Sequence, residues 1–188
     1  DYGGRTIHPG DIIPQDINGD GKIDDNDRTV VGTTDPKFFG GFGTDLSYKG
    51  FELYAFFTYS QGLKRISDLY NGLVSSAGMS AASVDLNDRW TPTHTNTLIP
   101  RAVYGESEYS YGNVDLGVQN SSFIRLSTFT LSYTFPKSVL RSMFLNNLKV
   151  YLSGSNMLLF TKDKGYDPET GDGYPNAKAV IFGLNVSL

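Results

Sequence analysis

The chain has 188 residues, enough for one domain with a sizeable core. Aromatic residues make up 13% and charged residues 19% of it, and it has 21 glycines, a mixture that suits an all-β protein with many turns. The lack of cysteine excludes a disulfide framework and a thiolate metal site, and a net charge of −4 without a basic stripe argues against nucleic acid as a partner.

Residues 1–36 are rich in Gly, Asp and Pro and are predicted to form a loop. The polar start at Asp1 has no signal peptide, so we expect a fragment or a processed product. Residues 11–27 hold six Asp and one Lys, a local charge of −5, and the rest of the chain sums to about +1. The acidity therefore belongs to one local site.

Residues 16–27 match the EF-hand calcium loop, in which oxygen ligands at alternate positions surround a hard cation. Gly21 stands where the sharp turn is needed. The candidate ligands are Asp16, Asn18, Asp20, the carbonyl of Lys22, Asp24 and Asp27. We expect one structural calcium ion in an isolated loop, since the flanks do not look like two helices. The alternative is a solvated acidic turn.

Period-2 alternation begins at residue 38 and predicts five strands, at residues 38–48, 51–60, 122–135, 147–160 and 179–188. Lys49 and Gly50 form a short turn, and residues 137–146 are predicted to make a helical turn. The remaining connections, 61–120 and 161–178, are long and polar. A loop as long as 61–120 is either functional or disordered.

The loop 61–120 contains aromatic residues that are candidates for a ligand path. These are Trp90, Tyr104, Tyr109 and Tyr111. Trp90 either stacks on a sugar ring or anchors its loop, and we favour the anchor. The three tyrosines either line a ligand path or pack the loop against itself.

The titratable residues show no catalytic constellation. His8 and His94 are far apart in the sequence, and no nucleophile elbow is present. Asp45 and Glu52 fall on the polar face of the first two strands, where charges lining a lumen explain them more simply than a glycosidase pair. We therefore expect that the protein is not an enzyme.

Strand length and loop alternation indicate a membrane barrel. Strands of about ten residues match a tilted bilayer crossing, and short connections alternate with long ones. Five strands cannot close around a lumen, so the rest of the barrel must come from elsewhere. The sequence predicts an all-β, antiparallel transmembrane β-barrel segment at residues 37–188, with the loops 61–120 and 161–178 and the calcium loop outside the cell.

The two faces of the predicted strands have different partners. One face is apolar and should meet outer-membrane lipid, and the other is small and polar and should meet a wet lumen. The residues expected to point to lipid are Phe57, Phe129, Leu131, Leu152, Phe182 and Leu184. Those expected to point to the lumen are Thr58, Thr130, Ser153 and Asn185.

Several segments together resemble the C-terminal part of the SusC/RagA family of TonB-linked (TonB-dependent) outer-membrane proteins of the Bacteroidetes. They are Asp16–Arg28, Pro36–Gly50 with the following FELYAFFTYSQG, Arg89–Pro92, Ser121–Pro136, Leu148–Asp167 and Tyr174–Leu188. Leu188 stands where the family usually has an aromatic residue. The signal peptide, plug, TonB box and most strands of the family pattern are not in this sequence.

The resemblance implies a function in nutrient import. Members of the family form a barrel of about 22 strands with an N-terminal plug and import oligosaccharides (glycans) or peptides. A SusD-like surface lipoprotein caps the barrel, and TonB, acting through the N-terminal part of the protein, supplies the energy. The cell outer membrane of a Gram-negative bacterium is the implied location.

Two other functions fit parts of the sequence. One is a calcium-binding adhesion or dockerin-like module, although a dockerin carries two such loops in a helical domain and this β-rich chain has one. The other is a soluble carbohydrate-binding sandwich, which does not need a membrane-length apolar face. Detergent dependence separates both from a membrane barrel.

Overall fold

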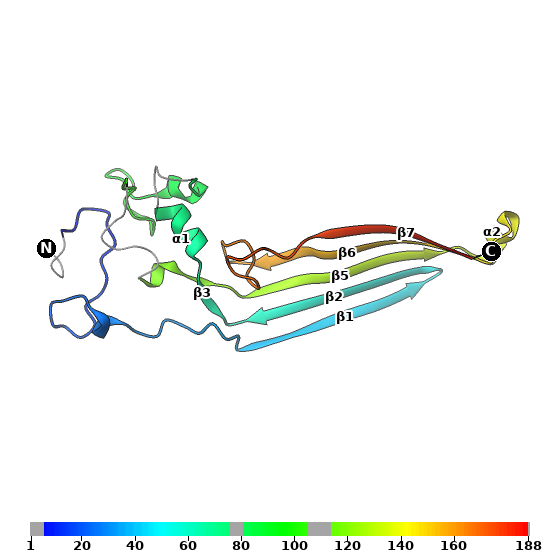
Figure 1. The fold of residues 1–188 in the computed structure, drawn as a ribbon, viewed down its shortest axis with the longest axis horizontal. Helices are drawn as coiled ribbons and strands as arrows, with labels where there is room; N and C mark the ends of the chain where they lie inside the picture. The colour runs from blue at the N-terminus through cyan, green and yellow to red at the C-terminus, as the bar shows by residue number, and fades with distance from the viewer. Residues whose placement is uncertain (1–5, 76–80, 105–113, 188) are drawn as a thin grey trace.

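A computed structural model describes residues 6–75, 81–104 and 114–187. Its main element is an antiparallel sheet of five strands in the order β1-β2-β5-β6-β7 (Figure 1). The strands are β1 (Phe38–Tyr48), β2 (Phe51–Gln61), β5 (Phe123–Thr134), β6 (Asn147–Thr161) and β7 (Ala179–Ser187). Each lies within a residue or two of its predicted range, because every one of them carries a clear period-2 pattern.

The connection between β2 and β5 is more structured than the sequence predicted. It holds β3 (Lys64–Ile66) paired with β4 (Val118–Asn120), the helix α1 (Asp68–Ser75) and the 3-10 turns η2 (Val84–Asp88) and η4 (Asp115–Gly117). The expectation of one long loop at 61–120 was therefore wrong for these parts. Elements of three to eight residues are too short to show a period in the sequence.

Shorter elements lie elsewhere along the chain. The 3-10 turn η1 (Asp25–Asp27) forms the end of the acidic loop at 16–27, and α2 (Lys137–Leu140) with η5 (Arg141–Met143) forms the predicted helical turn between β5 and β6. Lys49 and Gly50 both have positive φ, 47° and 88°, as a tight two-residue hairpin turn requires.

The strand register divides the sheet into two faces, because residues paired across an antiparallel ladder point to the same side. On one side Leu53 pairs with Leu131, Leu131 with Leu152, and Leu152 with Phe182. On the other side Thr130 pairs with Ser153. The register places all six residues predicted to face lipid on the first side and all four predicted to face the lumen on the second.

Charge separates these faces further. Among the paired residues of the five described strands, the first face carries no charged side chain, and the second carries Asp45, Glu52, Arg125 and Lys149. The register shifts beside Ser127 and between Ser155 and Leu158 are bulges, and the apolar and polar sides continue unchanged across them. We call the two sides the apolar face and the polar face.

Little of the sheet is covered. The buried apolar side chains of the described residues are Ile12, Val74, Phe123, Leu126 and Leu140. Large side chains on the apolar face remain open, and Phe182 is 70% exposed. None of the helices in the described ranges is long and apolar enough to span a membrane.

The two ends of the sheet differ (Figure 1). The N-terminal segment, the β2–β5 insert with α1, and the β6–β7 loop at residues 162–178 gather at one end, which we call the loop end. The Lys49-Gly50 turn, α2 and the C-terminus lie at the other, the turn end. The long connections therefore lie together at the loop end of the sheet, as predicted from the alternating directions of the strands.

Candidate functional site

The best-defined site at the loop end is a buried ion pair between a strand and a loop. Arg125, near the start of β5, donates from Nη2 to Oδ1 of Asp167 over 2.6 Å, and both side chains are at most 4% exposed. Glu169 lies 3.5 Å from the same guanidinium group. The guanidinium also lies over the ring of Phe123, 5.5 Å from its centroid. The β6–β7 loop is therefore fastened to the sheet.

A second arginine fastens the same loop to the insert. Arg65 of β3 donates from Nη2 to Oδ2 of Asp163 over 3.2 Å and to the backbone carbonyl of Asp167 over 3.3 Å. The hydroxyl of Ser121, which is fully buried, also donates to Asp163. Asp163 further accepts from the N–H of Gly165 over 2.7 Å. Arg65 and Ser121, which are far apart in sequence, thus bind the same carboxylate.

A third acidic residue of the loop holds the start of α1. Asp172 accepts from the hydroxyl of Ser67 over 2.8 Å and from the N–H of Leu69 over 3.1 Å. Ser67 in turn accepts from the N–H of Tyr70 over 3.2 Å, which satisfies another free N–H of the first helical turn. The loop therefore supplies part of the N-terminal cap of α1.

The fourth contact between the β6–β7 loop and the rest of the protein is more exposed to solvent. Lys164 donates from Nζ to Asp85 over 2.6 Å and to the hydroxyl of Tyr70 over 3.0 Å, and that hydroxyl donates to the same carboxylate over 2.6 Å. The hydrogen bonds from Lys164 and Tyr70 lower the pKa of Asp85, and the Asp85 carboxylate raises the pKa of Lys164. Both groups stay charged at neutral pH.

The pKa values of the loop carboxylates reflect their partners. Burial by itself raises the pKa of Asp167, but the N–H of Glu169, the Arg125 guanidinium and the N–H of Asn176 outweigh it and lower the pKa below the ordinary value. For Asp172, burial is likewise outweighed by Ser67 and the backbone N–H groups of α1. These carboxylates are ionised at neutral pH and match the positive charge of Arg65 and Arg125.

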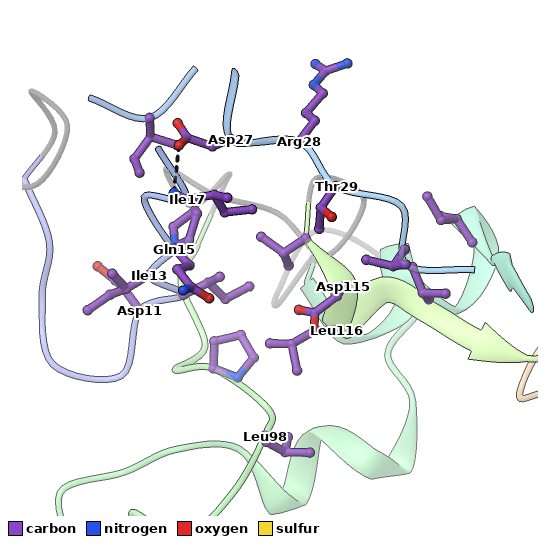
Figure 2. A pocket seen from close by; sticks show the side chains of 18 of the residues that line it. Asp11, Ile13, Gln15, Ile17, Asp27, Arg28, Thr29, Leu98, Asp115 and Leu116 are labelled. Carbon is purple, nitrogen blue, oxygen red and sulfur yellow. Dashed lines mark hydrogen bonds between the residues drawn. The ribbon is translucent and has the colours of Figure 1, made fainter. Parts of the chain in front are cut away.

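A hollow of about 980 Å³ lies between the N-terminal segment and the insert (Figure 2). Its lining is mixed: Ile13, Ile17, Leu98 and Leu116 supply apolar surface, and charged residues such as Asp27 supply polar surface. The N-terminal segment is held to the insert by an ion pair between Asp11 and Arg101 and by the Arg101 N–H, which donates to the Gly10 carbonyl over 2.8 Å.

Of the predicted ligand-path residues, Trp90 lines this hollow and Tyr104 does not. Trp90 packs on Gly10, where an added Cβ would come within 2.5 Å of the indole ring, and the backbone N–H of Trp90 donates to the Ile99 carbonyl over 2.8 Å. These contacts favour the anchor interpretation. Tyr104 is 83% exposed, and Tyr109 and Tyr111 lie outside the described residues.

The acidic loop at 16–27 is folded by its own side chains. Asp16 accepts from the N–H groups of Gly19 and Gly21, over 2.6 and 2.8 Å, and both glycines have positive φ. Asp27 accepts from the N–H groups of Ile17 and Asp24, both over 2.8 Å. Hydrogen bonds from these two N–H groups, Asp24 first, lower the pKa of Asp27.

Two more predicted ligands fold the middle of this loop. Asn18 Oδ1 accepts from the Asp20 N–H over 3.0 Å, and Asp20 Oδ1 from the Lys22 N–H over 2.8 Å. Asp24 caps η1 through the Asn26 N–H. In the described ranges, no group of three or more His, Cys, Asp or Glu side chains is arranged to hold a metal ion.

The ion cluster at 163–172 was not predicted from the sequence. One signal was available, because Arg125 interrupts a face of β5 that otherwise carries Ser and Thr from residue 127 onward. Four acidic residues in the ten from Asp163 to Asp172 offered a partner. The pairing itself depends on the fold, since the partners lie 42 residues apart.

No protein-family model matches the chain. Among curated proteins, TonB-dependent receptor P3 of Formosa agariphila is 31% identical over 96% of this chain and 19% of its own length. TonB-dependent receptor SusC of Bacteroides thetaiotaomicron is 25% identical over 92% of this chain and 17% of its own length. The solved RagAB peptide importer in the 'open-open' state has a TM-score of 0.71 and 28% identity, over 94% of this chain and 20% of that one.

The fold and these similarities define the class of protein. The sheet is a segment of an outer-membrane β-barrel, with one uncharged face and one polar face. The chain belongs to the SusC/RagA family of TonB-dependent receptors, whose members lie in the outer membrane of Bacteroidetes. It spans about one fifth of the length of the relatives that it matches.

Proposed function

We propose that this chain is part of the wall and outer loops of an importer that takes up oligomeric nutrients, either glycans or peptides, across the outer membrane. The full-length protein would take its energy from TonB. The similarity to TonB-dependent receptors and to a peptide importer supports this function. In this assignment the apolar face meets lipid and the polar face meets the transport path.

One observation carries the proposal, the division of the five-stranded sheet into two faces. A soluble sandwich would cover the face that holds Leu131, Leu152 and Phe182 with a second layer, yet these side chains are 40–70% exposed. The opposite face presents hydroxyl groups such as those of Thr130 and Ser153, which share a hydrogen bond of 2.9 Å. This is the pattern of a barrel wall between lipid and water.

Deletion of the gene for the full-length receptor tests import. The mutant strain should lose growth on at least one oligomeric nutrient from a panel of glycans and protein digests, and a plasmid copy should restore it. Growth on the corresponding monomer is the control, since a monomer crosses general porins. Unchanged growth on every oligomer in the panel would contradict the proposed function.

We also propose that a SusD-like surface lipoprotein docks at the loop end. Two exposed apolar residues make a matched test: Val84, 80% exposed, lies in η2 at the loop end, and Phe144, 91% exposed, follows η5 at the turn end. A photocrosslinking residue at position 84 of the full-length receptor should capture the lipoprotein, and one at position 144 should not. Equal capture at both positions would contradict docking at the loop end.

Calcium binding at residues 16–27 is a further part of the proposal. The spacing of the candidate ligands and the positive φ of Gly19 and Gly21 support it. In the structure these side chains cap backbone N–H groups, as those of Asp16 and Asp20 do. Both carboxylate oxygens of Asp16 and of Asp20 accept hydrogen bonds, so a cation would have to share or displace these bonds as it draws the side chains together. Its role would be to order the outer loop.

Calorimetry on the intact receptor tests the calcium site with two variants. Asp20→Ala removes a candidate ligand and should weaken calcium binding by at least about tenfold. Asp25→Ala is the control, because Asp25 is outside the ligand pattern and pairs with Arg28 over 2.9 Å. Equal calcium uptake by the wild type and the Asp20→Ala protein would end the claim.

A further inference from the structure

We propose that residues 162–172 form a fixed constriction inside the mouth of the lumen, and that Arg125 is the positioning residue that holds them there. The inference rests on the proposed function in one respect, the assignment of the polar face to the lumen. It adds a determinant of size selection, since the constriction would limit the cross-section of an oligomer that enters.

The strand register shows on which side of the sheet this loop lies. Arg125 is paired with Thr58 of β2 and Leu159 of β6, so its side chain projects from the polar face. Asp167 meets that side chain at 2.6 Å. The loop therefore folds back over the polar face. A loop that continued in the direction of the strands could not reach the Arg125 guanidinium.

Burial around Arg125 agrees with this placement. Phe123 and Arg125 are on the polar face and are 6% and 3% exposed, at the strand end where the loop and the insert lie. Farther along the same face, Thr130 and Ser153 are half-buried. Ser132, farther along still, is 4% exposed. The loop, together with the insert, covers the outer part of the polar face.

Three anchors fix the loop, and each binds a different part of the protein. Asp163 is bound by Arg65 of β3, Asp167 by Arg125 of β5, and Asp172 by the N-terminus of α1. The anchors are four and five residues apart, so no free stretch between them is long enough to swing away. Tyr166 lies between two anchors, and its side chain is 63% exposed.

The constriction can be measured without knowing the nutrient. A single cysteine is introduced as Thr130→Cys in the full-length receptor, with any native cysteine outside these 188 residues removed. Intact cells are then labelled from outside with maleimides that carry poly(ethylene glycol) chains of increasing size. Labelling should stop at a size limit set by the loop.

Arg125→Met should raise that limit. The larger maleimides should react about tenfold faster or more, because the loop would spend more of its time open, while the smallest maleimide reacts at the same rate. Arg141→Met at the turn end is the matched control and should leave the size limit unchanged. The same size limit in the parent and the Arg125→Met protein would overturn the constriction.

Hydrogen exchange tests the anchor itself. The N–H groups of Gly165, Glu169 and Asn176 bind the carboxylates of Asp163 and Asp167, and their exchange should accelerate in Arg125→Met. Arg125→Lys, which keeps the charge, should restore both protection and size limit in part. Exchange that is unchanged in Arg125→Met would overturn the role of Arg125.

Asp167→Asn provides a second variant if Arg125→Met does not assemble, because it removes only the charge of the anchor and keeps an acceptor for the Glu169 N–H. It should also raise the size limit, and an unchanged limit would overturn the proposal. Neither labelling nor exchange requires transport. A failure of the growth test with a clear size limit would therefore refute import and leave the constriction standing.

Discussion

The sheet and the loop end of this protein are held together by different forces. The sheet has a continuous main-chain ladder and exposes large apolar side chains such as Phe182, so its stability depends on what surrounds it. The loop end buries polar groups, among them Ser121, Arg125, Asp163 and Asp167, and is held by charge. The contrast predicts that a charge placed on the apolar face destabilises the sheet, and that loss of a polar partner destabilises the loop end.

The largest effect is expected on the apolar face of the sheet. Leu131→Arg would place a charge against lipid in the C-terminal half of β5 and should cost roughly 2–4 kcal/mol of unfolding free energy in lipid vesicles. Thr130→Arg, one residue away on the polar face, should be tolerated. If both substitutions were equally disruptive in denaturant titrations, the assignment of the two faces would be wrong.

A smaller and local effect is expected in the ion cluster. Asp163→Ala removes the acceptor of Ser121 and the partner of Arg65, and leaving such buried groups unpaired should cost about 1–3 kcal/mol. Hydrogen exchange should accelerate around β3 and the β6–β7 loop and stay unchanged in β2. Lys162→Ala, at an exposed position in the same loop, is the control. A global loss of sheet protection would contradict the separation of the two regions.

The contact at Lys164 should matter less. Tyr70→Phe removes the hydroxyl that bridges Lys164 and Asp85 and should cost about 0.5–1 kcal/mol, because the ion pair of 2.6 Å remains. The measurement is the local exchange rate in α1 compared with the wild type. A loss as large as that of Asp163→Ala would show that this exposed bridge is a main anchor of the loop.

The smallest effect is expected from pH in the neutral range. The pKa values of Asp167 and Asp172 are lower in the folded protein, so the stability that they contribute is present above their unfolded value, about 4. It is lost only as the pH falls through the folded values. A nitroxide at position 166 should keep the same mobility from pH 8 to 5 and become mobile well below 4. Release near pH 6 would contradict this account.

The sequence predicts the five-stranded sheet and its general class, a membrane β-barrel segment, because each strand carries a local period-2 signal. The placement of Leu131 and Thr130 on opposite faces needed only neighbouring residues and agrees with the register. The cluster at the loop end could not be predicted in the same way, since Arg65 and Asp163 are 98 residues apart and Ser67 and Asp172 are 105 apart. Such pairs depend on the topology that the strands create.

The central claim is that this sheet is a barrel wall between lipid and water. Its most direct test places single nitroxide labels at residues 128–134 of the receptor in native outer membranes and measures their contact with oxygen and with a water-soluble nickel chelate. Labels at 129, 131 and 133 should meet oxygen, and labels at 128, 130, 132 and 134 should meet nickel. Contact with nickel at all seven positions would contradict the claim.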